Sequence, residues 1–248
     1  ILNQDDKFYK FLKSKAIKSH LKVFSFSLNN KKSFANLLKI VKIKSKFKIY
    51  FRIGSKVDYY FSNSNTKSHI QNLLAAITTI SLFFDSKKIP KNIFLNFKIP
   101  NGRGDISKLK FKNKVINFID ESYNSNPLSL TTALMNFANL NPKNNKKHVL
   151  LGDMLELGKN SSKHHKSISK IINKLRIDKV HIYGKDIKKT YQGLEKNKKG
   201  LVLSNISQIN HLINKILSNN DYFMVKGSNS TGLNKQSQLL KLNKFNAL

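Results

Sequence analysis

The chain has 248 residues, of which 40% are hydrophobic, so it can bury one large core or two small ones. Its 46 Lys and Arg residues against 13 Asp and Glu residues give a formal net charge of +33, and the lack of cysteine excludes disulfides, thiolate metal sites and a cysteine nucleophile. No apolar run reaches the roughly 18 residues of a membrane span, and the first residues lack a signal-peptide pattern, so we expect a cytoplasmic protein with no membrane insertion.

Residues 1–100 read as strands and one strong helix, followed by a linker. The predicted strands are Val23–Leu28, Lys48–Ile53 and Val57–Phe61, the predicted helix is Ser68–Phe84, and a second helix is expected over Lys91–Phe97. Pro and three turn-forming residues occur together between Ile99 and Gly104, which indicates a domain boundary. We therefore predict one domain over residues 1–100 and another over 101–248.

From Val115 onward, short apolar runs alternate with segments whose apolar residues recur every three or four positions. The predicted strands are Val115–Ile119, His148–Leu151, Val180–Tyr183, Leu201–Leu203 and Tyr222–Val225. The predicted helices are Leu128–Leu140 (with Ser129 as a possible cap), Ser161–Leu175, Ile206–Leu217 and Gln236–Leu242. Alternation of this kind predicts an α/β domain with a mainly parallel, Rossmann-like sheet.

Polar residues and glycine follow the predicted strands at the points where ligands bind in such sheets. Asp120, Asp153, Gly184 and Lys226 all occupy these strand ends. Carboxylates and amides ahead of a helix N-terminus can hold a ribose, a metal or a phosphate. The alternative is that Asp120 and Asp153 only cap helices, and from the residues alone the two interpretations are equally open.

Six segments, in order along the chain, resemble the Mur ligase family, and in particular the members that add D-Ala-D-Ala to the peptidoglycan precursor. The most specific is Asp120–Pro127, which reads Asp-Glu-Ser-Tyr-Asn-Ser-Asn-Pro. The others are Ile1–Asp6, Asn72–Ala76, Gly102-Arg103, Leu151–Gly158 with His165 beyond it, and Val225–Ser228. The resemblance implies the later part of a central ATP-binding domain over residues 1–100 and a complete C-terminal domain over 101–248.

The resemblance also implies ATP-driven amide formation with Mg²⁺, in which UDP-MurNAc-tripeptide is activated as an acyl phosphate and then joined to D-Ala-D-Ala. It implies a nucleotide-binding group, consisting of Asn72, Arg103 and Glu121. It also implies a substrate-binding group, consisting of Asn124, Asn126, Asp153, Lys226 and Ser228. From residue type alone, each has a plainer interpretation: Asn72 as a helix cap, Arg103 as a linker residue, His164 and His165 as surface residues, and Tyr123 as a packing residue.

Several positions depart from the family pattern. Glu121 stands where Asp is usual, Asn229 where Arg is common, and Ser68-His69 where His-Asn is usual. The sequence also contains no Gly-x-x-x-x-Gly-Lys-Ser/Thr phosphate loop. We therefore expect no catalytic residue and no metal ligand in this chain, the main Mg²⁺ ligands upstream of Ile1, and no ATP hydrolysis by the chain alone.

Two alternatives to the ligase remain open. The first is a non-catalytic or degenerate module that keeps the Mur ligase fold, which the substitutions would permit. The second is a basic nucleic-acid-binding protein, suggested by the charge. Only three of the 46 basic residues are arginines and the lysines are dispersed, which favours compositional drift over specific nucleic-acid binding. We expect a monomer.

Overall fold

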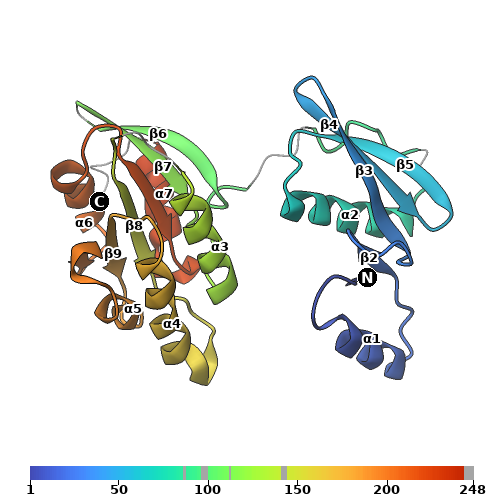
Figure 1. The fold of residues 1–248 in the computed structure, drawn as a ribbon, viewed down its shortest axis with the longest axis horizontal. Coiled ribbons are helices and arrows are strands. Elements are labelled where there is room, and N and C mark those ends of the chain that lie inside the picture. The colour runs from blue at the N-terminus through green and yellow to red at the C-terminus, as the bar shows by residue number, and fades with distance from the viewer. Residues whose placement is uncertain (86–87, 96–99, 112, 141–143, 243–248) are drawn as a thin grey trace. The chain divides into compact units, whose positions relative to one another are not determined.

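The computed structural model describes residues 1–248 except 86–87, 96–99, 112, 141–143 and 243–248. The chain divides into two compact units, Ile1–Lys98 and Ile99–Leu248 (Figure 1). Each unit has its own sheet and its own buried apolar cluster. No helix in the described ranges is both long and apolar enough to cross a membrane.

The first unit is a five-stranded sheet in the order β1-β2-β3-β4-β5 with one helix packed on it. The strands are β1 Leu2–Asn3, β2 Ser25–Ser27, β3 Ala35–Ile43, β4 Lys46–Ile53 and β5 Lys56–Ser62. Helix α2, Lys67–Ser81, buries Leu73, Leu74 and Ile77 against Phe51 and Tyr60 of the sheet, so the predicted helix and strands are confirmed. Helix α1, Tyr9–Lys18, was not predicted, and none of its residues is buried.

The helix predicted over Lys91–Phe97 is wrong for its described residues, because 91–95 form turns, while 96 and 97 lie outside the described residues. Phe94 is buried with its ring edge against Tyr60, at a centroid distance of 5.6 Å. Lys91 forms an ion pair of 2.6 Å with Asp58. The segment is therefore held by individual side chains, and not by a helical apolar stripe.

The second unit is a six-stranded sheet in the order β10-β9-β8-β11-β7-β6, parallel except for β6. Its strands are β6 Asp105–Phe111, β7 Lys114–Asp120, β8 Lys147–Gly152, β9 Lys179–Tyr183, β10 Lys199–Leu203 and β11 Tyr222–Lys226. Its helices are α3 Pro127–Ala138, α4 Ser161–Asn173, α5 Lys188–Gln192, α6 Gln208–His211 and α7 Leu233–Lys241, with a π-helical turn at Leu212–Ile216. The mainly parallel, Rossmann-like sheet is thus confirmed, whereas strand β6 and helix α5 were not predicted.

Helices cover both faces of this sheet (Figure 1). Helices α3 and α4 form one apolar cluster with Val149 and Leu151, whereas α6, the π-turn and α7 form the other with Leu150. Successive residues of β8 therefore enter opposite cores, which explains its continuous apolar run. The predicted helix over Ile206–Leu217 winds as a single α-turn followed by a π-turn. Of its predicted apolar stripe, Ile209, Leu212 and Ile213 are buried, whereas Ile216 is 40% exposed.

Candidate active site

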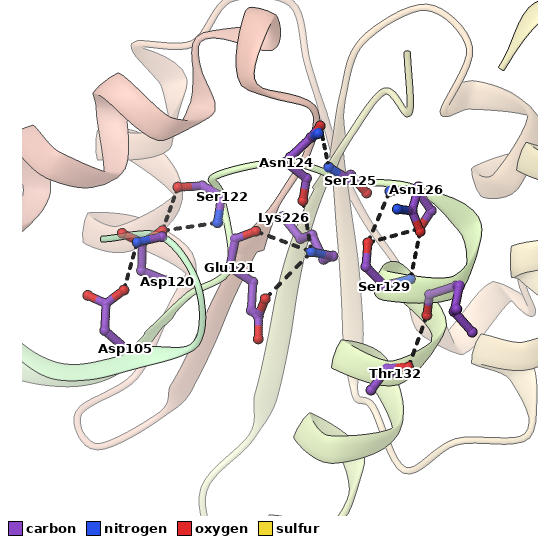
Figure 2. A network of polar contacts seen from close by, with 12 residues as sticks. Asp105, Asp120, Glu121, Ser122, Asn124, Ser125, Asn126, Ser129, Thr132 and Lys226 are labelled. Carbon is purple, nitrogen blue, oxygen red and sulfur yellow. Dashed lines mark hydrogen bonds and ion pairs between the residues drawn. The ribbon is translucent and has the colours of Figure 1, made fainter. Parts of the chain in front are cut away.

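Strands β8, β11 and β7 are neighbours in the sheet, so their carboxyl ends meet at one edge. The register pairs Val225 with Asp120, and Lys226 with Leu151. Segments that are about a hundred residues apart in sequence therefore come together here, as the order of the strands predicted. Figure 2 shows the polar contacts of this edge around Glu121 and Lys226.

Lys226 is the centre of the cluster. Its ammonium lies 3.5 Å from Glu121 Oε2, and it donates hydrogen bonds to the carbonyls of Glu121 (3.3 Å) and Asn124 (3.0 Å), as Figure 2 shows. The Lys226 side chain is 3% exposed and that of Glu121 is 25% exposed. The ammonium of Lys226 thus donates its hydrogen bonds to the loop after β7. Lys226 therefore orders that loop and is not a free cation.

Burial shifts the pKa of both partners of this pair toward the neutral form. Burial raises the pKa of Glu121, and the nearby Lys226 charge offsets part of that rise. Burial lowers the pKa of Lys226, and Glu121 offsets part of that fall. Each charge is therefore stabilised mainly by the other, so the pair is sensitive to the loss of either partner.

The amide residues of the loop have local structural roles. Asn126 is the N-cap of α3: its Oδ1 accepts from Ser129 N at 2.8 Å, and its N donates to Ser129 Oγ at 3.1 Å (Figure 2). The prediction that Ser129 is the cap is therefore wrong, because Ser129 is the third helical residue of a capping box. Asn124 is exposed, and its Oδ1 accepts from Ser125 N at 2.8 Å.

Ser228 joins this loop to the segment after β8. Its Oγ accepts from Leu155 N at 2.8 Å and donates to Ser125 O at 3.2 Å. Its N donates to Asp153 O at 2.9 Å. The loops after β7, β8 and β11 are therefore held together by one buried hydroxyl and the backbone beside it.

Arg103 and Tyr123 form an exposed stacked pair beside the loop. The Arg103 guanidinium lies 4.2 Å from the Tyr123 ring centroid, and both residues are exposed. Gly102 holds the two together, because its carbonyl accepts from Tyr123 N at 2.9 Å. Gly102 has φ +79°, and a Cβ there would lie 2.8 Å from Tyr123 N, so a side chain does not fit. Tyr123 therefore does not pack between strand and helix.

The Asp153 carboxylate closes the turn that follows β9. Its oxygens accept from Lys185 N at 3.0 Å and Ile187 N at 2.7 Å. Beside it opens a pocket of about 540 Å³ whose lining includes Tyr183, Lys188 and Thr231. Asp153 therefore lines a pocket that also contains lysine side chains, and its carboxylate already accepts hydrogen bonds from backbone amides.

His165 is buried, so its prediction as a surface residue is wrong, whereas His164 is partly exposed. Met154 N donates to His165 Nε2 at 3.1 Å, which leaves the proton on Nδ1, where it bonds to Ser161 O at 2.9 Å. The imidazole thus holds the turn after β8 from helix α4. The lysine-rich helix gave no sign of this role, because the partner lies in another loop; only the family resemblance had named His165 together with the Leu151–Gly158 segment.

Asn72 belongs to the first unit, where it is exposed within α2. The helix begins at Lys67 after the N-cap Thr66, so Asn72 is not the cap. Lys241, Gln238 and Asn234 of α7 also reach the loop after β7, and the sequence did not single them out. Among the described residues, no group of three or more His, Asp or Glu side chains is arranged to hold a metal ion.

The sequence of the chain is similar to those of known proteins. Residues 107–229 match the family model described as Mur ligase, glutamate ligase domain. The chain is 28% identical over 136 residues to the UDP-N-acetylmuramoyl-tripeptide–D-alanyl-D-alanine ligase of Bacillus subtilis (55% of this chain, 29% of the relative). It is 30% identical over 187 residues to the same ligase of Buchnera aphidicola (75% of this chain, 38% of the relative).

Solved structures share the fold. A crystal structure of MurF from Acinetobacter baumannii matches with a TM-score of 0.69 and 20% identity, covering 97% of this chain and 51% of that one. MurF from Thermotoga maritima in complex with ADP matches with a TM-score of 0.63 and 16% identity, covering 96% of this chain and 53% of that one. The chain spans 29–44% of the length of the curated relatives and about half of these solved chains. The chain thus carries a Mur ligase domain over residues 107–229, and it resembles the C-terminal portion of MurF-like members.

Proposed function

We propose that this chain is part of an ATP-dependent ligase that joins D-Ala-D-Ala to UDP-MurNAc-tripeptide. The observation that carries the proposal is the Glu121–Lys226 cluster at the carboxyl ends of β7 and β11, within segments that resemble the D-alanyl-D-alanine-adding ligases. In this proposal Ile1–Lys98 is the later part of the ATP-binding domain and Ile99–Leu248 is the C-terminal domain. The protein is cytoplasmic and monomeric.

The residues around Arg103 fit one side of a nucleotide site. Arg103 is an exposed cation braced on an aromatic ring, suited to contact a phosphate or the face of a base. Glu121 has a partly exposed side chain, whose carboxylate is suited to accept from a ribose hydroxyl. Asn72, in the first unit, is likewise proposed as a nucleotide-binding residue.

Asn124, Asn126, Asp153, Lys226 and Ser228 would shape the cleft for the peptide substrates. Their contacts support a positioning role: they tie the loops after β7, β8 and β11 to one another. The γ-phosphoryl group of ATP would pass to the substrate carboxylate, giving an acyl phosphate, and the amine of D-Ala-D-Ala would then displace phosphate to form the amide. The negative charge of that transfer needs cations around the phosphates, and Mg²⁺ would supply most of this charge.

The sequence contains no Gly-x-x-x-x-Gly-Lys-Ser/Thr phosphate loop, so in this proposal the main ligands of Mg²⁺ lie outside this chain. The chain by itself would then hydrolyse no ATP. Turnover of ATP by the purified 248-residue chain would overturn this part of the proposal.

The test of the ligase uses the protein encoded by the complete reading frame that contains these residues. ADP release should require both UDP-MurNAc-tripeptide and D-Ala-D-Ala. Arg103→Ala should raise the KM for ATP about tenfold or more, because a charge-assisted contact is lost. Arg176→Ala is the matched control, since Arg176 is also exposed and lies outside the cluster. No ADP release with both substrates present would instead favour a non-catalytic module of the same fold.

A further inference from the structure

The last helix of the described chain, α7, turns one polar side toward the two loops that carry Arg103 and Glu121. Asn234, Gln238 and Lys241 are spaced four and three residues apart, so they lie on one side of the helix. An adjacent side of α7 buries Leu233 and Leu240 in the sheet's second apolar cluster. The helix axis is thus fixed by apolar packing while its polar side is free to hold other groups.

Lys241 joins two carboxylates that would otherwise repel each other. Its ammonium lies 2.6 Å from Asp105 Oδ2 and 2.6 Å from Asp120 Oδ2. Asp105 and Asp120 are direct partners in the antiparallel ladder of β6 and β7, and like charges at such positions are destabilising. Asp120 is fully buried, and this ammonium is its ion-pair partner away from water. Burial lowers the pKa of Lys241, but its bonds to the two carboxylates raise it by more.

Each carboxylate, in turn, holds one of the two loops. Asp105 Oδ1 accepts from Gly102 N at 2.8 Å, which fixes the turn that presents Arg103. Asp120 Oδ1 accepts from Ser122 N at 3.1 Å and from the Ser122 hydroxyl, which fixes the start of the loop beyond Glu121 (Figure 2).

Asn234 and Gln238 reinforce the same arrangement. Gln238 Nε2 donates to Asp120 Oδ2 at 3.4 Å, and Asn234 Nδ2 donates to Ser122 Oγ at 3.3 Å. Asn234 also lies against Gly102, whose missing Cβ would sit 2.7 Å from Asn234 Nδ2.

We propose that Lys241 is a positioning residue for nucleotide binding: through Asp105 and Asp120 it holds the Arg103 turn and the Glu121 loop at a fixed spacing. The effect on nucleotide binding rests on the proposed function, whereas the positioning of the two loops rests on the contacts described above. Side chains of α7 contact Asp105, Asp120 and Ser122, whereas Asn124 is held by Lys226, which also holds Glu121.

The first experiment needs no catalysis and uses the 248-residue chain. Amide hydrogen exchange at Gly102 and Ser122 should become about tenfold faster in Lys241→Met, because each carboxylate loses its cation. The amide of Ser129, which is held by the α3 cap, should be unchanged. Lys235→Met is the matched control, since Lys235 is an exposed lysine of the same helix. Unchanged exchange at both amides in Lys241→Met would overturn the proposal.

The second experiment uses the complete protein and measures steady-state kinetics. Lys241→Met should raise the KM for ATP about tenfold, because a small displacement of binding groups is costly, and leave the KM for D-Ala-D-Ala within about twofold, since its loop keeps Lys226. Lys241→Arg should restore the KM for ATP, because a guanidinium can bridge two carboxylates. A fall in kcat with both KM values unchanged would indicate lost folded protein and overturn the positioning role. Absence of turnover in the unmodified protein would overturn the proposed function, and the exchange result would then decide the role of Lys241 by itself.

Discussion

Replacing His181 by Asn should remove much of the acid sensitivity of the second unit. His181 is 1% exposed and stacks on His148, with ring centroids 5.4 Å apart and planes at 11°. Leu201 N donates to His181 Nδ1 at 2.9 Å, so the ring proton of His181 is on Nε2 and bonds to His148 Nδ1 at 3.1 Å. The proton of His148 is then on Nε2, 3.6 Å from an oxygen of Asp221. The folded structure therefore accommodates both imidazoles in their neutral form.

Burial, followed by the charges of His148 and Lys179, lowers the pKa of His181 to about 3. Burial also lowers the pKa of His148, although Asp221 and Asp178 oppose that shift. Because the unfolded chain binds a proton near pH 6.5, stability is complete above that pH and is lost as the pH falls toward 3. From pH 7.5 to pH 5, His181 alone accounts for about 2 kcal/mol, or a melting temperature lower by about 4–8 °C.

Urea unfolding at pH 7.5 and pH 5 measures this effect. His181→Asn keeps an acceptor for Leu201 N but cannot take up the proton, so its loss of stability between the two pH values should be about 2 kcal/mol smaller than that of the unmodified chain. His164→Asn is the control, because His164 is partly exposed on α4. Equal pH dependence in His181→Asn and the unmodified chain would refute the burial of a neutral histidine pair.

Three further substitutions test the site loops by their effect on the free energy of unfolding. Asn126→Ala should cost about 1 kcal/mol in urea unfolding, because it removes the N-cap of α3, and no loss would contradict the capping box. Lys226→Met should cost about 3 kcal/mol and raise the pKa of Glu121 further, since it leaves a largely buried carboxylate without its cation. An unchanged pKa of Glu121 in a carboxyl titration by NMR would contradict the ion pair. Gly184→Ala should destabilise the chain by about 2 kcal/mol, because Gly184 has φ +139° and a Cβ there would lie 2.5 Å from the Asp153 carboxylate. An unchanged melting temperature would show that the turn can accommodate a side chain at this position.

Residues whose role depends on neighbours in the sequence were predicted well. The apolar stripe of α3 and the apolar run of β8 are local patterns, and both entered the core as expected. The segment from Asp120 to Pro127 was identified from its composition and its place after a strand. Pattern alone failed where individual contacts decide the conformation, as at Phe94, whose burial against Tyr60 accompanies turns in place of a helix.

The sequence by itself determined the alternation of strands and helices, the family resemblance, and which strand ends carry polar residues, because each of these is a property of consecutive residues. Only the tertiary structure decided what those residues contact. Lys241 and Asp105 are 136 positions apart, and Lys226 and Asn124 are 102 positions apart. With 43 lysines in the chain, nothing local distinguishes these two from the others. The order of strands in the sheet places Lys226 and Lys241 beside buried carboxylates and carbonyls. Because these groups are removed from water, losing one of these ammonium groups costs more stability than losing an exposed one.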